Sequence, residues 1–221
     1  MQYNMNRFNF QIITKDFNIT EYKTYLGELS RIAVKSYADV LQLRNKKLTA
    51  RDNYYAALYI KNLLNKFSSD RKPLFIVNDR PDIAACAGAD GVHIGQDDFP
   101  LAMIKKNYPN LIVGVSVDNL KQALDAQNNG ADYIGAGPVY GTSSKIDAGN
   151  IMSPEILKTI CRNVKIPVIA IGGINTYNIK ELAAYGVKGA AVISAVSDSV
   201  NPLETAATFR QNIDKMMGVK Y

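Results

Sequence analysis

Tryptophan is absent from this sequence of 221 residues, histidine occurs once, and cysteine occurs only at Cys86 and Cys161. The two cysteines are far apart and form no Cys-x-x-Cys pair, so the sequence predicts neither a disulfide scaffold nor a thiolate metal site. We interpret both as small hydrophobic residues buried in helical segments. The single histidine, His93, disfavours a His-cluster metal site and a Ser–His triad, and we interpret it as a structural residue inside a strand.

Long apolar runs are also missing. No stretch approaches the roughly 20 apolar residues that cross a membrane, and the first residues lack the apolar core of a signal peptide. Lysine and arginine number 26 against 20 acidic residues, but the cations are scattered rather than clustered as in a nucleic-acid interface. We therefore expect a cytoplasmic protein with small phosphorylated partners and no nucleic-acid or membrane partner, and we leave open whether it is a homo-oligomer.

Short apolar, β-branched runs alternate with longer amphipathic stretches along the chain. Nearly continuous apolar runs are typical of parallel strands that are buried on both faces. The sequence predicts eight strands, at Phe8–Thr14, Asp39–Arg44, Leu74–Asp79, Gly91–Gly95, Leu111–Val117, Tyr133–Tyr140, Pro167–Gly173 and Ala190–Val196.

Helix signals fill the gaps between these strands. Thr49 is predicted to cap one helix, and Ser153-Pro154-Glu155 to begin another. Gly130 and Gly186 are predicted to end two more. The last helix carries one apolar stripe, formed by Leu203, Ala206, Phe209, Ile213 and Met216.

Eight strand–helix units without a linker predict one domain over residues 1–221, either a closed barrel or an open doubly wound sheet. No Gly-x-Gly-x-x-Gly follows the first predicted strand, where a dinucleotide-binding sheet requires it. We therefore favour a fold of the α/β class, a single (β/α)8 TIM barrel. Its active site would lie at the carboxyl ends of the strands.

Cations gather at one of those predicted strand ends. Gln42, Arg44 and Lys46 share one face where the second strand ends, because side chains alternate along a strand. Such a face suits a phosphate or a pyrophosphate, with the planar fork of Arg44 as a bidentate donor. The alternative is a salt-bridged strand exit.

Carboxylates follow the next two predicted strands. Asp79 follows the third strand, and Asp97 and Asp98 follow the fourth. Two carboxylates beside a phosphate suit Mg²⁺, which takes carboxylate, phosphate and water oxygens. The alternatives are a turn residue for Asp79 and a helix N-cap for Asp97 or Asp98.

The later strands end in hydroxyls and glycines. Ser116 ends the fifth strand, and the segment Gly141–Lys145 after the sixth is rich in hydroxyls and closes with a cation, so it suits either an anion or a plain connector. Gly172-Gly173 and Ser194 belong to the last two strand ends, whose loops frequently bind phosphate in barrels. The alternative for the glycines is a tight turn.

In their order and spacing, these segments resemble the family of thiamine-phosphate synthases and thiazole tautomerases from about Asp39 to Val196. The resemblance rests on Gln42–Lys46, Val77–Arg80, Gly88–Asp98, Gly130–Gly135, Gly137-Pro138, Thr142–Lys145, Ala170–Ile174 and Val192–Ser194. It implies a synthase that joins hydroxymethylpyrimidine diphosphate to thiazole phosphate and releases pyrophosphate, with Mg²⁺ as its cofactor.

The resemblance also implies the roles of individual residues. The pyrimidine diphosphate would be bound by Gln42, Arg44, Lys46, Asn78, Ser116 and Lys145, with Ser116 and Lys145 as the catalytic residues. Mg²⁺ would be held by Asp79 and Asp98. The thiazole phosphate would be bound by Thr142, Ser143, Ser144, Gly173, Ile193 and Ser194.

Four positions depart from the family pattern. Asn45 stands where synthases usually carry Glu, Gly141 where Pro is common, and Ser144 where Thr is common. Asp118 stands where the tautomerases, and often the synthases, carry His. The lack of this acid–base group disfavours the first alternative function, a tautomerase-like isomerase. The second alternative is a non-catalytic protein that binds thiazole or thiamine phosphates.

Overall fold

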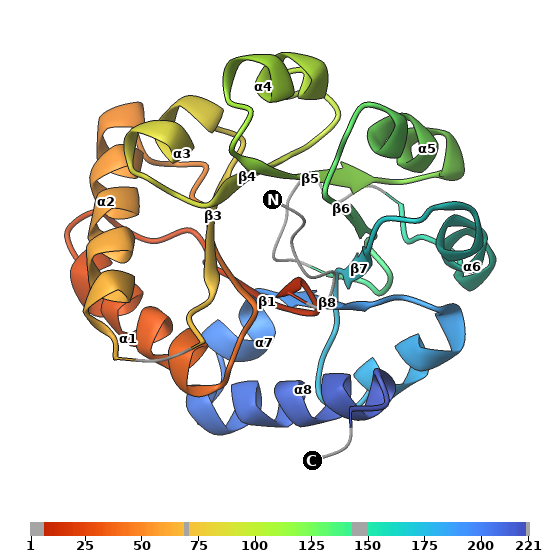
Figure 1. Cartoon of the computed structure of the whole chain (residues 1–221). Coiled ribbons are helices and arrows are strands. Elements are labelled where there is room, and N and C mark those ends of the chain that lie inside the picture. Colours follow the sequence, from red (N-terminus) through yellow and green to blue (C-terminus); the bar gives the residue numbers. More distant parts are fainter. Residues whose placement is uncertain (1–6, 69–70, 143–149, 220–221) are drawn as a thin grey trace.

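The computed structural model describes residues 7–68, 71–142 and 150–219. Eight parallel strands follow one another in sequence order around a closed barrel, and β8 pairs with β1. The helices lie outside this ring of strands (Figure 1). The closed ring confirms the (β/α)8 barrel and excludes the open sheet.

The strands are four to six residues long, and the helices range from four to 17 residues. The strands are β1 Phe10–Ile13, β2 Val40–Leu43, β3 Leu74–Asn78, β4 Gly91–Ile94, β5 Ile112–Val117, β6 Tyr133–Ala136, β7 Val168–Ile171 and β8 Gly189–Val192. The helices are α1 Tyr22–Lys35, α2 Ala50–Lys66, α3 Pro81–Cys86, α4 Leu101–Asn107, α5 Leu120–Asn128, α6 Pro154–Asn163, the 3₁₀ helix η2 Ile179–Tyr185, α7 Ser194–Ser197 and α8 Pro202–Met216.

β6 and β8 each end four residues before the predicted end of the strand, and the other strands end within two residues of theirs. β6 stops at Ala136 because Pro138, two residues later, has no N–H group to continue the ladder. The chain nevertheless stays beside β7, and Val139 N donates to Ile171 O at 2.9 Å. β8 stops at Val192 because the chain turns into α7 at Ser194. Ser194 therefore begins a short helix rather than ending a strand.

The predicted helix boundaries are confirmed. The Thr49 side chain caps α2 by accepting from Asp52 N, and the Ser153 side chain caps α6 by accepting from Ile156 N. Gly130 follows the end of α5, and Gly186 ends η2 with a φ of 85°. These signals are local in sequence, which explains why they could be predicted.

The interpretation of the cysteines is wrong for one of them. Cys86 is exposed at the end of α3, and Cys161 in α6 is only partly buried. α3 is a six-residue helix, and it turns this side chain outward. In the described part of the chain, no helix is long and apolar enough to cross a membrane.

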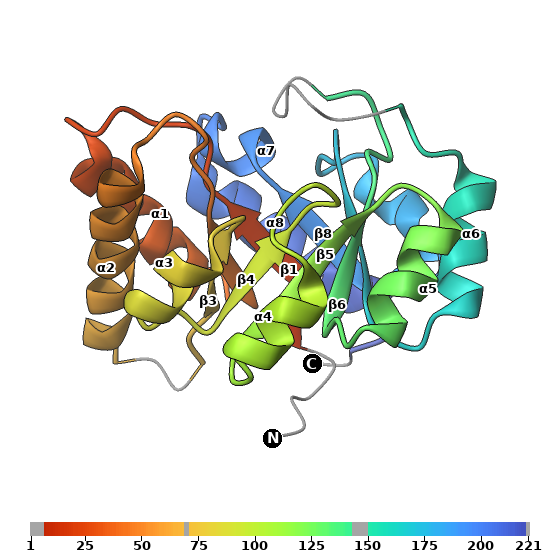
Figure 2. The same cartoon turned by 90° about the horizontal axis from the view of Figure 1, so that it is seen from above.

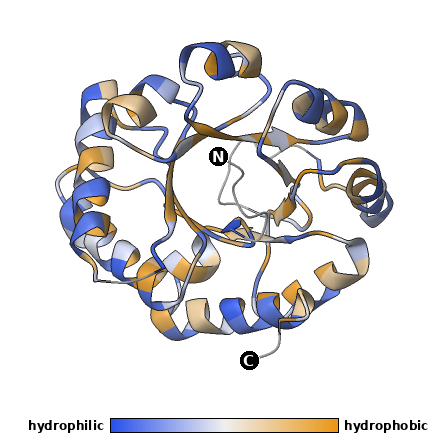
Figure 3. Ribbon diagram, in the orientation of Figure 1, coloured by the Kyte–Doolittle hydropathy of each residue, from blue (hydrophilic) through white to orange (hydrophobic). Residues whose placement is uncertain are grey.

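The apolar core has two layers, one inside the barrel and one between the strands and the helices. The apolar colouring of the strands and the mixed colouring of the helices show the outer layer (Figure 3). The inner layer consists of Phe8, Ile13, Val40, Leu74, Ile76, Ile112, Tyr133, Ile169, Ala191 and Ile193. Strand alternation sends these side chains inward, and the inward positions nearer the carboxyl ends are mostly polar.

Candidate active site

A cavity of about 600 Å³ opens at the carboxyl ends of the strands. All eight strands contribute to its lining. α7 and the loops that follow the strands lie at this end of the barrel (Figure 2). The predicted site residues that line it are Gln42, Arg44, Lys46, Asn78, Asp79, Asp98, Ser116, Thr142, Gly173, Ile193 and Ser194. Three further predicted residues, Ser143, Ser144 and Lys145, lie outside the described residues.

The cations after β2 are held in place by the loop after β1. Thr14 Oγ1 accepts from Arg44 N at 2.8 Å and donates to Arg44 O at 2.6 Å. Asp16 Oδ1 accepts from Lys46 N at 3.0 Å and lies 3.8 Å from the Arg44 guanidinium. These bonds fix the backbone, so the side chains of Arg44 and Lys46 reach the cavity from one strand end. The common face predicted for them is confirmed.

Asp79 and Asp98 lie beyond the ends of β3 and β4, close enough for a hydrogen bond between their carboxyl groups when one of them carries a proton. Burial, together with the neighbouring Asp98 carboxylate, raises the pKa of Asp79 from 3.8 to about 6, although Lys46 and Arg44 oppose the shift. Lys46 Nζ lies 3.8 Å from Asp79 Oδ2. Two neighbouring carboxylates repel each other, so a proton or a cation between them is favourable.

Asp98 does not cap a helix. Its Oδ2 accepts from Gly95 N at 2.6 Å, whereas α4 has Pro100 at its N-cap and no side-chain cap. Gly95 makes room for this carboxylate, since a Cβ there would lie 3.0 Å from Asp98 Oδ2. The bond turns Asp98 back over the end of β4 and towards Asp79, and the N-cap alternative for Asp98 is wrong.

The donor set at this corner fits a divalent cation that is completed by phosphate. In the described ranges, no group of three or more Asp, Glu, His or Cys side chains could hold a metal ion by itself. Asp79 and Asp98 supply two carboxylates, and Mg²⁺ commonly binds one or two carboxylates while taking its remaining oxygens from phosphate and water. The pair therefore suits Mg²⁺ together with a diphosphate.

The opposite side of the cavity is built from loops after β6, β7 and β8. Gly173 has a φ of 61°, and a Cβ there would lie 2.4 Å from Gly141 O and 2.7 Å from Tyr140 Cβ. Glycine is therefore required by the close approach of two loops, which supports the turn interpretation of Gly172-Gly173. Thr142 and Ser194 also line the cavity.

His93 lines the cavity, whereas the sequence favoured a purely structural role for this single histidine. It projects into the barrel rather than away from the cavity, with Nδ1 3.0 Å from the Tyr133 hydroxyl and Nε2 3.0 Å from Ser116 Oγ. Gln11 was missed as well; it is buried in β1 and lines the cavity floor. The sequence does hold a signal for both residues, since each is a polar side chain within an otherwise apolar strand. Both occupy positions whose side chains point into the barrel.

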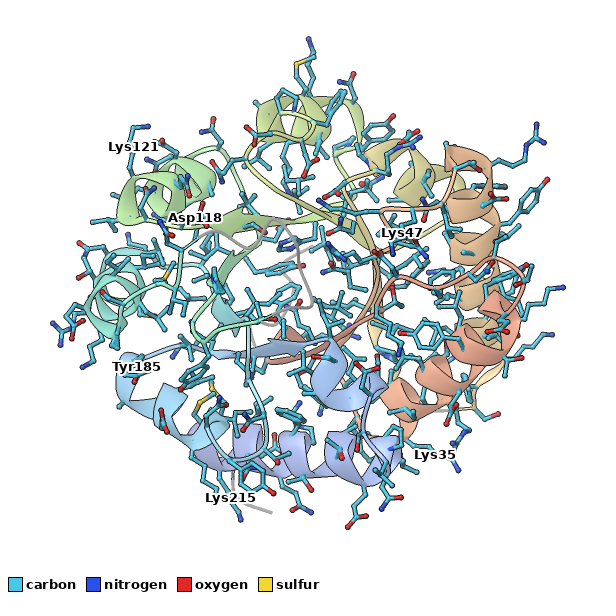
Figure 4. The ribbon with its side chains drawn as sticks, turned by 180° about the vertical axis from the view of Figure 1, so that it is seen from behind. Lys35, Lys47, Asp118, Lys121, Tyr185 and Lys215 are labelled. Atoms are coloured by element: carbon cyan, nitrogen blue, oxygen red, sulfur yellow. The ribbon has the colours of Figure 1, made fainter. Side chains whose placement is uncertain are left out.

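Two departures from the family pattern have different surroundings. Asn45 is buried and ties loops together, since its Nδ2 donates to Phe17 O at 2.8 Å and its Oδ1 accepts from Lys47 N at 3.0 Å. It does not line the main cavity. Asp118 does line it, and lies exposed on the rim beside the beginning of α5 (Figure 4).

Comparisons with known proteins agree on one family. The family model described as thiamine monophosphate synthase matches residues 11–196. A thiamine-phosphate synthase of Coprothermobacter proteolyticus is 43% identical over 189 residues, which cover 85% of this chain and 87% of the relative. One from Methanocella arvoryzae is 47% identical over 170 residues, 76% of this chain and 78% of the relative. The solved structure of a thiamine phosphate pyrophosphorylase from Pyrococcus furiosus is 34% identical, covers 97% of this chain and 99% of that chain, and superposes with a TM-score of 0.80.

Proposed function

The chain belongs to the thiamine monophosphate synthase family, and on that premise we propose how its barrel performs the synthase reaction. The enzyme is a transferase that joins hydroxymethylpyrimidine diphosphate to thiazole phosphate and releases pyrophosphate, giving thiamine phosphate. Both substrates are small phosphorylated molecules. Because such charged molecules do not cross membranes unaided, we place the reaction in the cytoplasm.

The observation that carries the proposal is the corner where Arg44, Lys46, Asp79 and Asp98 meet in one cavity. Two cations next to two facing carboxylates suit a ligand that brings both a high negative charge and a divalent cation. The diphosphate of the pyrimidine substrate has this charge. We therefore assign the β2–β4 side of the cavity to the diphosphate, with Gln42, Asn78 and Ser116 as further polar contacts.

In the reaction, the bond between the pyrimidine methylene carbon and a diphosphate oxygen breaks, and the electron pair leaves with the pyrophosphate. The electron-rich aminopyrimidine stabilises the positive charge on the methylene carbon. The lone pair of the thiazole nitrogen then forms the new C–N bond, and the positive charge ends on the thiazolium ring. No proton has to be removed, so the protein needs mainly to position both substrates and stabilise the leaving charge.

Each side chain at the corner has a part in that task. Arg44 and Lys46 place positive charge beside the departing pyrophosphate. Ser116 and Lys145 are assigned as the catalytic contacts, of which Ser116 lines the cavity and Lys145 lies outside the described residues. Asp79 and Asp98 would hold Mg²⁺, which, when bound, neutralises charge on the pyrophosphate leaving group.

The thiazole phosphate is assigned to the opposite side. Thr142, Ile193 and Ser194 line that side, and Gly173 shapes it by letting two loops approach closely. Ser143 and Ser144, also assigned to this phosphate, lie outside the described residues. The two substrates then enter one cavity from facing sides, which brings the methylene carbon and the ring nitrogen together.

The test is to supply both substrates with Mg²⁺ and to follow pyrophosphate and thiamine phosphate. Formation of both products in equal amounts, dependent on both substrates, supports the synthase. Interconversion of thiazole phosphate tautomers, followed by NMR without the pyrimidine substrate, would indicate the isomerase instead. Binding of thiazole or thiamine phosphate without any turnover would indicate a non-catalytic protein.

A further inference from the structure

Tyr133, His93 and Ser116 form a chain of side-chain contacts inside the barrel, next to the proposed diphosphate site. In the strand register His93 on β4 pairs with Gly114 on β5, and Gly114 pairs with Tyr133 on β6. His93 Nδ1 lies 3.0 Å from the Tyr133 hydroxyl, and His93 Nε2 lies 3.0 Å from Ser116 Oγ. The imidazole thus connects a buried phenol to a hydroxyl that lines the cavity.

The donors and acceptors in these contacts determine which atom donates and which accepts in each hydrogen bond. Tyr133 is fully buried, and burial raises the pKa of its phenol far above the ordinary value, so the phenol keeps its proton. His93 Nδ1 is the hydrogen-bond partner of this hydroxyl among the described residues. A buried O–H without an acceptor is costly, so the phenol donates to Nδ1.

The rest of the direction follows from that first bond. If Nδ1 accepts, the neutral ring carries its proton on Nε2, and this N–H donates to Ser116 Oγ. Ser116 then accepts from below, and its own proton is available for an acceptor in the cavity. The opposite tautomer would require Ser116 to donate to the imidazole and would leave the phenol proton without an acceptor.

The neighbouring strands leave the space that this arrangement needs. A Cβ on Gly114 would lie 2.2 Å from Tyr133 Cζ and 2.5 Å from His93 Nδ1, distances at which no side chain fits. A Cβ on Gly135 would lie 3.2 Å from His93 Cε1. Two inward glycines on adjacent strands therefore make room for the two rings. The Gln96 side chain holds the Ser116 backbone, since Nε2 donates to Ser116 O at 2.6 Å.

We propose that His93 is a positioning residue that fixes Ser116 as a hydrogen-bond donor towards the bound pyrimidine diphosphate. In this role Ser116 contacts an acceptor atom of the substrate, such as a diphosphate oxygen, and not a donor such as the pyrimidine amino group. The identity of the ligand rests on the proposed function. The direction of the chain from Tyr133 through His93 to Ser116 rests only on the protein.

The direction is measured without any substrate. Because His93 is the only histidine in the sequence, tag-free protein labelled with ¹⁵N-histidine has a single imidazole to observe by NMR. We expect a neutral ring with a pyrrole-type Nε2 and a pyridine-type Nδ1. In Tyr133→Phe the phenol donor is lost, and we expect the preference for the Nε2 proton to weaken. A proton on Nδ1 of the wild-type ring, neutral or charged, would overturn the proposal.

Steady-state kinetics of two His93 variants test whether His93 positions Ser116 or only fills space. We expect His93→Leu to lower kcat/KM for the pyrimidine diphosphate by roughly tenfold, the effect of one hydrogen bond. His93→Gln, whose amide N–H can reach Ser116 as Nε2 does, should stay within about threefold of the wild type. KM for thiazole phosphate should stay unchanged in both. Equal impairment of two folded variants would overturn the role of the N–H donor.

A double variant tests whether His93 acts through Ser116. We expect Ser116→Ala with His93→Leu to be no slower than Ser116→Ala alone, because the positioned hydroxyl is already gone. Independent losses that multiply would overturn the proposal. If the wild type turns over neither substrate, the proposed function fails, and the NMR measurement still decides the direction of the chain.

Discussion

The two ends of the barrel use aspartate in opposite ways. At the amino ends of the even strands, Asp39, Asp90 and Asp132 follow an alanine and precede β2, β4 and β6. Each accepts a hydrogen bond from a backbone N–H at or just beyond the start of the preceding strand, from Phe10, Phe75 and Val113 at 2.9, 2.7 and 2.7 Å respectively. Each also pairs with a cation, supplied by Arg210 and Arg71, by Lys61, and by Lys105.

At the carboxyl ends, Asp79 and Asp98 are neighbours, and the Asp98 carboxylate helps to raise the pKa of Asp79. Asp79 has Lys46 nearby at 3.8 Å, which does not cancel the effect of Asp98 and burial on its pKa. Each carboxylate at the amino end has a backbone N–H donor and a cation of this protein as partners. At the mouth, the charge of Asp79 is only partly balanced by Lys46 and Arg44. The comparison indicates that the mouth gives up some stability to prepare a site for charged ligands.

The largest expected effect lies at the amino end. Asp39 is almost fully buried, and Asp39→Asn removes the charge that faces Arg210, itself buried. Breaking such a pair is expected to cost about 3 kcal/mol of unfolding free energy, measured by urea denaturation. The remaining folded enzyme should keep kcat within about twofold, since the residue is at the far end from the cavity. Unchanged stability would show that the two ends do not differ in this way.

The matched control for all aspartate variants is Asp125→Asn. This residue is exposed on α5, and the ion pair it forms among the described residues is with Lys121, one turn earlier. The variant should change stability by less than about 0.5 kcal/mol and leave activity unchanged. A larger loss would mean that any aspartate removal perturbs this barrel.

The next effect lies at the mouth and concerns catalysis. We expect Asp79→Asn and Asp98→Asn each to lower kcat by at least roughly a hundredfold, about 2.7 kcal/mol, because each removes a ligand of the proposed Mg²⁺. The double variant should be little slower than either single one, since both residues act through one ion. Steady-state rates of pyrophosphate release across a Mg²⁺ titration measure this. Asp98→Asn with wild-type kcat and wild-type Mg²⁺ dependence would remove Asp98 from the site.

The same Asp79→Asn variant should gain stability while it loses activity. The pKa of Asp79 is raised from 3.8 to about 6, so the folded state holds the proton more tightly, and wild-type stability falls as the pH rises through this range. Without metal or substrate, the variant should be about 1–3 kcal/mol more stable than the wild type at pH 7.5. The difference should shrink steeply by pH 4 and vanish at about pH 3, below the ordinary pKa of 3.8. A constant difference across this pH range would contradict this cause.

The smallest effect is expected at another carboxylate that lines the cavity, Asp118. Asp118 is exposed on the rim, where its backbone N–H donates to Gln122 Oε1 at 2.6 Å. Asp118→Asn should change kcat by less than about threefold, measured in the same pyrophosphate assay, because an exposed carboxylate is screened by solvent. A hundredfold loss of kcat would show that Asp79 and Asp98 matter no more for catalysis than Asp118 does.

Much of this arrangement could be predicted from local patterns. Apolar runs predicted all eight strands, and the spacing of Gln42, Arg44 and Lys46 placed their side chains on one face. The early end of β6 follows from Pro138, a local signal that the predicted strand Tyr133–Tyr140 left out of account. The N-cap alternative for Asp98 depends instead on what the neighbouring loops do. The local sequence is compatible both with Asp98 capping the next helix and with Asp98 accepting from Gly95 N, which the structure shows.

The sequence by itself determined the order of strands and helices, the alternation of side chains along each strand, and the residue types at the mouth. The alternation is local, because side chains alternate along any strand. Only the tertiary structure decided which inward residues meet. The contacts of His93 with Tyr133 and Ser116 span 40 and 23 residues, and depend on the register of three strands. Closure of the barrel sets that register, and no pattern within a single strand encodes it.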